Sequence, residues 1–145
     1  MVGRPAELSV PDSAELPAEY PPPGTSQPPV HNGAYRPGIS FDSHNLAQWG
    51  WQMHQAKDVI AGQVGTHAPD YVLVELGFND LGWGVSGAAG LLDDQRTLVA
   101  NARSARSGIR IAVANVVHRT PLEAAPELPA LISSYNSMLA GAGKP

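Results

Sequence analysis

From about residue 44 onward, apolar residues gather into segments that glycine, proline and short polar residues separate. Two segments, Tyr71–Leu76 and Ile109–Val117, are almost continuously apolar, which is typical of strands inside a parallel sheet with both faces covered. Around them, apolar residues recur at steps of three and four, which predicts amphipathic helices. Strand, helix and strand in this order predict a βαβ unit and therefore an α/β fold.

Three helices are expected from this periodicity. The first should start near Asn45 and end at Gly62 or Gly65, and the second should cover residues 88–106. The third should cover residues 127–139, where the apolar residues form one stripe. Glycine or proline follows each of these segments, as expected where a helix ends.

The turn after the first apolar strand carries the most promising chemistry. Gly77 allows a tight turn, Asn79 offers amide N–H donors, and Asp80 can hold the turn by accepting backbone hydrogen bonds. Ligands of open α/β sheets bind beyond the carboxyl ends of the strands, and a well-aimed amide can stabilise an oxyanion. The alternative is that Asn79 and Asp80 only close a strand-to-loop turn, since both residue types are common in turns.

Two stretches resemble conserved blocks of the SGNH (GDSL-type) esterase and lipase family. Residues 69–80, which end in Gly-Phe-Asn-Asp, are similar to the family's third block, and His44–Trp51 is similar to its second block. The resemblance implies that Gly50 and Asn79 form the oxyanion hole and that Asp80 supports the turn. It also implies a three-layer α/β/α fold with a flavodoxin-like parallel sheet in the strand order 2-1-3-4-5.

Two other blocks of the family do not occur in this sequence. The family's nucleophilic serine lies in a Gly-Asp-Ser block and its base in an Asp-x-x-His block, and neither pattern is present. Residues 1–145 are therefore expected to form a single partial domain that is truncated, lacks the family's first and last strands, and has its nucleophile and base outside the chain. The proline-rich residues 4–40 are expected to be a loop within this domain rather than a disordered tail.

Three further residues are candidates for lining a substrate pocket. Phe78 and Trp83 lie beside the Asn-Asp pair, and His118 follows the second apolar strand. The glycine-rich residues 81–87 match neither a P-loop nor a dinucleotide fingerprint, so a flexible pocket rim is favoured over a phosphate site. Simple packing of the two aromatic residues remains the alternative to a pocket role, and His118 is also considered as a substitute base.

Composition excludes several classes of protein. The chain has 145 residues, a formal charge of −4 and no cysteine, which argues against nucleic-acid binding and excludes disulfides and a cysteine nucleophile. No apolar run is long enough to span a membrane and no signal-peptide pattern occurs, which leaves the compartment open. His44 and His54 lack a third ligand at zinc spacing, and neither a metal nor an organic cofactor is expected.

The resulting hypothesis is an SGNH-type ester hydrolase represented by its middle portion, inactive as this chain alone and acting on a small-molecule ester when completed. The alternative is a catalytically inactive binding or scaffold protein that keeps the hydrolase pocket. A flavodoxin-like nucleotide-binding module is disfavoured because no phosphate-loop signature occurs. Since the family's first strand would lie beside Tyr71–Leu76, an open strand edge there is expected to permit self-association.

Overall fold

The computed structural model describes residues 4–5, 44–46, 50–121, 123 and 125–142. Its elements, in chain order, are β1 (Arg4–Pro5), β2 (His44–Asn45), α1 (Met53–His67), β3 (Tyr71–Val74), α2 (Phe78–Gly82), α3 (Ala88–Ala105), β4 (Arg110–Val113) and α4 (Leu128–Ala142). Apart from residues 4–5, the proline-rich residues 4–40 lie outside the described residues. None of the described helices is long and apolar enough to cross a membrane.

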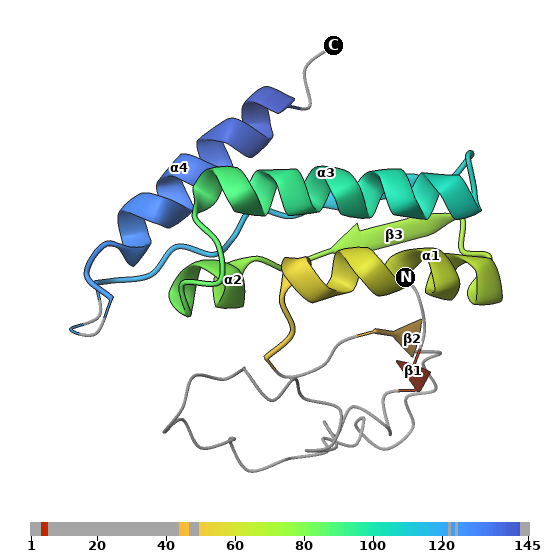
Figure 1. The fold of residues 1–145 in the computed structure, drawn as a ribbon, viewed down its shortest axis with the longest axis horizontal. Coiled ribbons are helices and arrows are strands. Elements are labelled where there is room, and N and C mark those ends of the chain that lie inside the picture. Colours follow the sequence, from red (N-terminus) through yellow and green to blue (C-terminus); the bar gives the residue numbers. More distant parts are fainter. Residues whose placement is uncertain (1–3, 6–43, 47–49, 122, 124, 143–145) are drawn as a thin grey trace, which may run out of the picture.

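The two strands predicted from the apolar segments form a parallel pair. β3 and β4 are in register from Tyr71 opposite Arg110 to Val74 opposite Val113. The connection between them runs through α2 and α3, so the predicted βαβ unit is confirmed (Figure 1). β1 and β2 form a separate antiparallel pair. The fold is α/β with a parallel sheet, which has two strands in the described part of the chain.

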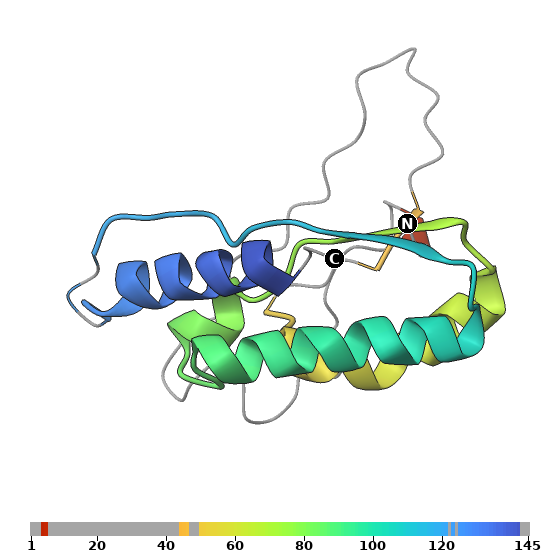
Figure 2. The same ribbon diagram turned by 90° about the horizontal axis from the view of Figure 1, so that it is seen from above.

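The helices α1, α3 and α4 lie on one face of the β3–β4 pair (Figure 2). Their apolar stripes meet the inward side chains of the strands in one core. Its buried members are Met53, Ala56, Ile60, Val64, Val72, Val74, Leu81, Ala88, Leu91, Leu92, Leu98, Ala102, Ile109, Val116, Leu128, Ile132 and Tyr135. Removal of this apolar surface from water is the main stabilising contribution to such a fold.

Burial along β3 alternates instead of being continuous. Val72 and Val74 are buried, whereas Tyr71 is 53% and Leu73 is 61% exposed. The expectation that both faces of this strand are covered is therefore wrong for the described structure. The physical reason is that the described helices cover one face only, so successive side chains point alternately to the core and away from it.

The start of α1 also differs from the prediction. A helix beginning near Asn45 is wrong, because His44 and Asn45 belong to β2 and Gly50 has a left-handed φ of 79°. The N-cap is instead Gln52, whose backbone N–H donates to the Gln55 side chain at 3.4 Å. The helix therefore begins only after the segment that matches the family's second block.

The remaining helix boundaries agree more closely. α1 continues through Gly62 and Gly65 to His67, because neither glycine forces a left-handed turn there. α3 and α4 lie within one turn of their predicted ranges, and their buried residues fall on the expected stripes. The short helix α2 was not predicted, and it lies where a turn was expected.

Candidate active site

Gly77, the N-cap of α2, follows β3 after two residues and has a backbone conformation that suits glycine. Its φ is 114°, a value that side chains with a Cβ rarely adopt. A Cβ at this position would lie 2.8 Å from Leu91 Cδ2 and 3.0 Å from Val116 Cγ2. Both the backbone angle and the packing therefore require glycine here. The sharp change of direction puts Asn79 and Asp80 in the first turn of α2.

Asp80 joins two elements rather than supporting only its own turn. Its side chain is fully buried, with Oδ2 accepting the Met53 N–H at 2.9 Å and Oδ1 accepting the His54 N–H at 3.0 Å. Those N–H groups begin α1, where a helix has no internal acceptors and favours a negative charge. The Asp80 carbonyl also accepts the Val85 and Ser86 N–H groups at 2.9 and 3.2 Å. Asp80 thus connects the start of α1 to α2 and to the loop before α3.

The surroundings of Asp80 oppose its ionisation. Burial raises the pKa of the Asp80 carboxyl above its ordinary value of 3.8, and the charge of Asp94 adds to this rise, whereas the two bonds from α1 act in the opposite direction. Burial likewise raises the pKa of Tyr135 to about 12, with the charge of Asp80 as the second cause. Among the described residues, the Tyr135 hydroxyl is buried without a hydrogen-bond partner. The negative charge of the Asp80 carboxylate is therefore stabilised mainly by backbone N–H groups.

Asn79 is fixed against the segment that precedes α1. Its side-chain amide donates to the Trp51 carbonyl at 2.8 Å, which uses one of the two amide hydrogens. Next to Trp51, the Gly50 carbonyl accepts the Gln52 amide at 3.0 Å. Gly50 and Asn79 therefore belong to neighbouring segments at the carboxyl end of β3, although 28 positions separate Trp51 from Asn79 in the sequence.

A small cavity opens at this end of the strand. Its volume is about 190 Å³, and it is lined by Trp51, Glu75, Leu76, Gly77, Phe78, Asn79, Val116 and Val117. Phe78 is among the lining residues, and the Arg119 guanidinium lies 5.6 Å from the Phe78 ring centre.

Three expected residues are not among the cavity's lining. Trp83 is the C-cap of α2, and His118 is exposed after β4. Gly50 itself does not line the cavity, but the next residue, Trp51, does. The reasoning from sequence missed Trp51, Val116 and Val117. Trp51 ends the second matched block, and the two valines follow β4, so proximity to a strand end was the available signal.

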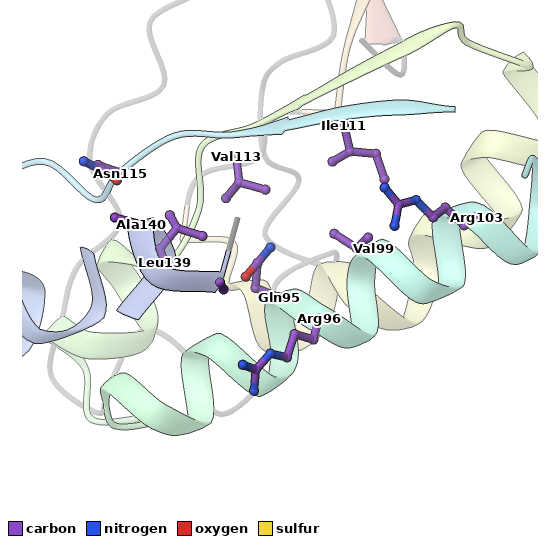
Figure 3. A pocket seen from close by; sticks show the side chains of 10 residues that line it. Gln95, Arg96, Val99, Arg103, Ile111, Val113, Asn115, Leu139 and Ala140 are labelled. Atoms are coloured by element: carbon purple, nitrogen blue, oxygen red, sulfur yellow. The ribbon is translucent and has the colours of Figure 1, made fainter. Parts of the chain in front are cut away.

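A larger cavity of about 610 Å³ lies between α3, α4 and the helix-facing side of β4. Figure 3 shows Gln95 and Arg103 extending from α3 towards it, and Arg96, which also lines it, pairs with Asp93 at 3.1 Å. Neither Asn79 nor Asp80 lines this cavity. We therefore assign the candidate site to the smaller cavity, where the amide donor is.

The described residues contain no hydrogen bond between a serine hydroxyl and a histidine ring. His54 Nδ1 lies 3.1 Å from Asp94 Oδ2, and the same carboxylate is 3.9 Å from the Lys57 ammonium. This arrangement is a partly exposed ion-pair cluster between α1 and α3. Within the described ranges, no group of three potential metal ligands is present.

Comparison with known proteins agrees with the fold. A model of the GDSL-like Lipase/Acylhydrolase family matches residues 20–145. No curated protein matches the sequence.

Two solved structures are similar to the chain. A carbohydrate esterase family 3 protein from Talaromyces cellulolyticus is 25% identical with a TM-score of 0.61, over 73% of this chain and 51% of that protein. An acetyl esterase mutant with an acetate ion is 26% identical with a TM-score of 0.55, over 65% of this chain and 43% of that protein. The chain thus spans about half the length of the first structure and less of the second. Because the family match covers most of the sequence and both neighbours are esterases, the chain belongs to the GDSL-like lipase/acylhydrolase family of ester hydrolases.

Proposed function

We propose that this chain carries the oxyanion-binding part of a hydrolase site for esters of a short acyl group, such as acetyl. The Asn79 amide and the Gly50 N–H are the oxyanion donors, and Asp80 positions both by holding α1 against α2. The observation that carries this proposal is the 2.8 Å hydrogen bond from Asn79 to Trp51, beside the small cavity at the carboxyl end of β3.

The chemistry requires donors that are fixed before the reaction begins. When a serine oxygen attacks the ester carbonyl and a histidine takes its proton, negative charge develops on the carbonyl oxygen. One fixed donor to that oxygen is worth roughly 3–4 kcal/mol of transition-state stabilisation. One hydrogen of the Asn79 amide bonds to Trp51, which leaves the other for the oxyanion. By the family resemblance, the serine and histidine are supplied by blocks that this sequence does not contain.

The proposed size of the acyl group follows from the cavity. About 190 Å³ is smaller than the roughly 300–1,000 Å³ of sites for drug-sized ligands. Trp51 and Phe78 form aromatic walls beside the Asn79 amide, and they suit a small acyl group better than a long chain. The two neighbouring structures, described as a carbohydrate esterase and an acetyl esterase, favour the same class of substrate.

The alternative function is a catalytically inactive binding protein that keeps this cavity. It is favoured by the lack of a serine–histidine hydrogen bond among the described residues. Incubation of the full chain with a fluorophosphonate probe, together with turnover of a short aryl ester, tests for a nucleophile within the chain. We expect neither labelling nor turnover above background. Stoichiometric labelling of one serine would show that the chain holds its own nucleophile.

Binding of acetate tests the oxyanion donors independently of turnover. We expect the NMR signals of the Asn79 side-chain amide and the Gly50 N–H to shift together and saturably when acetate is added. Asn79→Ala should abolish the shift at Gly50. Asn101→Ala is the matched control, because the Asn101 amide also donates to a backbone carbonyl, that of Lys57 at 2.8 Å, but lies outside the cavity. Equal loss of the acetate-induced Gly50 shift in both variants, or no such shift in the unmodified chain, would contradict the assignment.

A further inference from the structure

The cavity of about 610 Å³ between α3, α4 and β4 has no part in the proposed ester site. None of the described residues that line it also lines the smaller cavity beside Asn79. Its volume lies within the roughly 300–1,000 Å³ that is typical of sites for small molecules. The cavity is therefore large enough for a small ligand, and the chemistry of its lining indicates which class of ligand suits it.

Gln95 supplies a buried hydrogen-bond acceptor to this cavity. The residue is only 8% exposed, and Figure 3 shows its side chain extending from α3 into the space below β4. Its Oε1 atom is buried and has no hydrogen-bond partner among the described residues. Buried polar atoms nearly always have a partner, and one without a partner carries a free-energy penalty. A ligand that donates a hydrogen bond to Gln95 Oε1 would remove this penalty.

Arg103 supplies a positive charge to the same cavity. The arginines on either side of it in the sequence, Arg96 and Arg106, pair with Asp93 and Asp70. Arg103 forms no ion pair with a described residue, and none of the described residues that line the cavity is acidic. A guanidinium binds a carboxylate through two parallel N–H···O bonds. The cavity therefore favours a ligand with a carboxylate.

The two polar groups lie at opposite ends of an apolar space. Gln95, Val99 and Arg103 follow one another at steps of four, which puts them along one side of α3. Eight residues of an α-helix span about 12 Å, and Figure 3 shows the Arg103 guanidinium extending back along the helix towards Gln95. Val99 lies between them, and Ile111 and Val113 face them from β4. The apolar part of a ligand would occupy this middle section.

We propose that this cavity binds a small organic acid with an apolar skeleton, a carboxylate at one end and a hydroxyl at the other. The Arg103 guanidinium holds the carboxylate, and the hydroxyl donates to Gln95 Oε1. A neutral ligand would leave the charge of Arg103 unused. A nucleotide suits the cavity less well, because none of the described lining residues is aromatic and could stack on a base. The proposal does not depend on the proposed ester site.

Three matched compounds test the class of ligand. 4-Hydroxyphenylacetate has both polar groups on an apolar ring, phenylacetate lacks the hydroxyl, and 4-hydroxyphenylethanol lacks the charge. In calorimetry with the full chain, we expect the first compound to bind about five- to tenfold more tightly than either of the others. It should shift the backbone N–H signals of Val99 and Ile111 in NMR spectra, but not the side-chain amide of Asn79. Equal affinity for the three compounds, no binding of the first, or a shift at Asn79 alone would overturn the proposal.

Three variants test the two residues separately. Arg103→Gln should weaken binding of 4-hydroxyphenylacetate about tenfold, whereas Arg106→Gln, the matched control outside the cavity, should change it less than twofold. Gln95→Leu should make phenylacetate and 4-hydroxyphenylacetate bind equally well. Because Gln95→Leu removes an acceptor without a partner, its Tm should not fall, so a change in its preference cannot come from unfolding. Equal effects of the two arginine changes, or an unchanged preference in Gln95→Leu, would contradict the assignment.

Discussion

The carboxyl end of β3 and its outer edge have different surroundings. At the carboxyl end, Asn79 donates to Trp51 and the Asp80 carboxylate accepts two N–H groups of α1. Along the edge, the backbone of Leu73 faces outward and its side chain is exposed. The first region is held by hydrogen bonds within the described chain, whereas β4 is the only described strand that pairs with β3.

This contrast shows which features a short stretch of sequence can specify. The carboxyl end depends on a glycine turn and on two polar side chains, of which Asn79 reaches Trp51 and Asp80 reaches the start of α1. Its geometry is retained wherever those contacts form. Among the described strands only β4 lies beside β3, and no local pattern within β3 indicates which segment lies at its other edge.

Among changes at the carboxyl end of β3, Gly77→Ala should lower the free energy of unfolding the most. The added Cβ meets Leu91 and Val116 and forces a left-handed residue to carry a side chain. Strain and overpacking together are expected to lower the free energy of unfolding by about 4 kcal/mol. Gly84→Ala separates the two causes, since Gly84 has a φ of 68° but open space around it, and should cost about 1–2 kcal/mol. Urea unfolding measures both, and equal effects would contradict the packing argument.

Asp80→Ala should lower the free energy of unfolding by about 3 kcal/mol. Two buried N–H groups at the start of α1 lose their acceptor, each at a cost on the order of 1–3 kcal/mol, and relief from burying a charge offsets part of this. Asp93→Ala is the control, because this exposed aspartate pairs with the exposed Arg96 and should change stability by less than about 0.5 kcal/mol. Similar losses in the two variants would show that the contact between Asp80 and α1 contributes little.

The pH dependence of Asp80 has a defined sign. Since burial raises its pKa above 3.8, the folded state binds the proton more tightly than the unfolded state. The free energy of unfolding should therefore fall as pH rises above about 4, relative to an Asp80→Asn variant without this titration. Acid-range urea titrations of the two proteins measure this difference, and a rise with pH would contradict the dominance of burial.

Tyr135→Phe should stabilise the protein by about 1 kcal/mol. The Tyr135 hydroxyl is buried without a partner near Asp80, so its removal relieves an unmet hydrogen bond. The pKa of about 12 also predicts that the wild-type chain loses stability as pH rises from 10 to 12, and that the variant does not show this loss. Thermal unfolding across that range measures both effects. Destabilisation by Tyr135→Phe would indicate that the hydroxyl has a stabilising partner.

Leu73→Thr should have the smallest effect on the isolated chain. Its side chain is mostly exposed, and threonine suits a strand, so the free energy of unfolding at high dilution should change by less than about 0.5 kcal/mol. A large loss of stability at high dilution would mean that Leu73 is packed within a single copy.

The fold could be predicted where the spacing of apolar residues agreed with the positions of the glycine, proline and short polar residues between segments. The apolar runs gave both strands of the parallel pair, and the three-to-four periodicity gave α3 and α4. The predicted start of α1 was wrong because the apolar residues Leu46 and Trp49 continue the helical pattern before Gly50. The contact that fixes the start of α1 is the hydrogen bond from the Met53 N–H to Asp80, which lies 27 positions further along the chain. A local sequence pattern cannot predict a contact between residues so far apart.

The candidate site was predictable in part. The glycine turn with Asn79 and Asp80 was identified from residue chemistry, and the family resemblance added Gly50. The reach of Asp80 to α1 and the role of Trp51 as acceptor were not predicted, because both depend on how α2 docks against a distant segment. The burial of β3 on only one face was also not predicted, since an apolar run does not show whether one or both faces of the strand are covered.

Amide hydrogen exchange of the full chain tests the contrast most directly. The first N–H groups of a helix normally exchange fast because they have no internal acceptor. We predict slow exchange for Met53 and His54, which bond to Asp80, and fast exchange for Ala89 and Gly90 in α3, whose N-cap has no side-chain hydrogen bond. The Leu73 amide, which faces away from β4, should exchange faster than the Met53 and His54 amides. Exchange at Met53 and His54 as fast as at Ala89 and Gly90 would contradict the anchoring of α1 by Asp80.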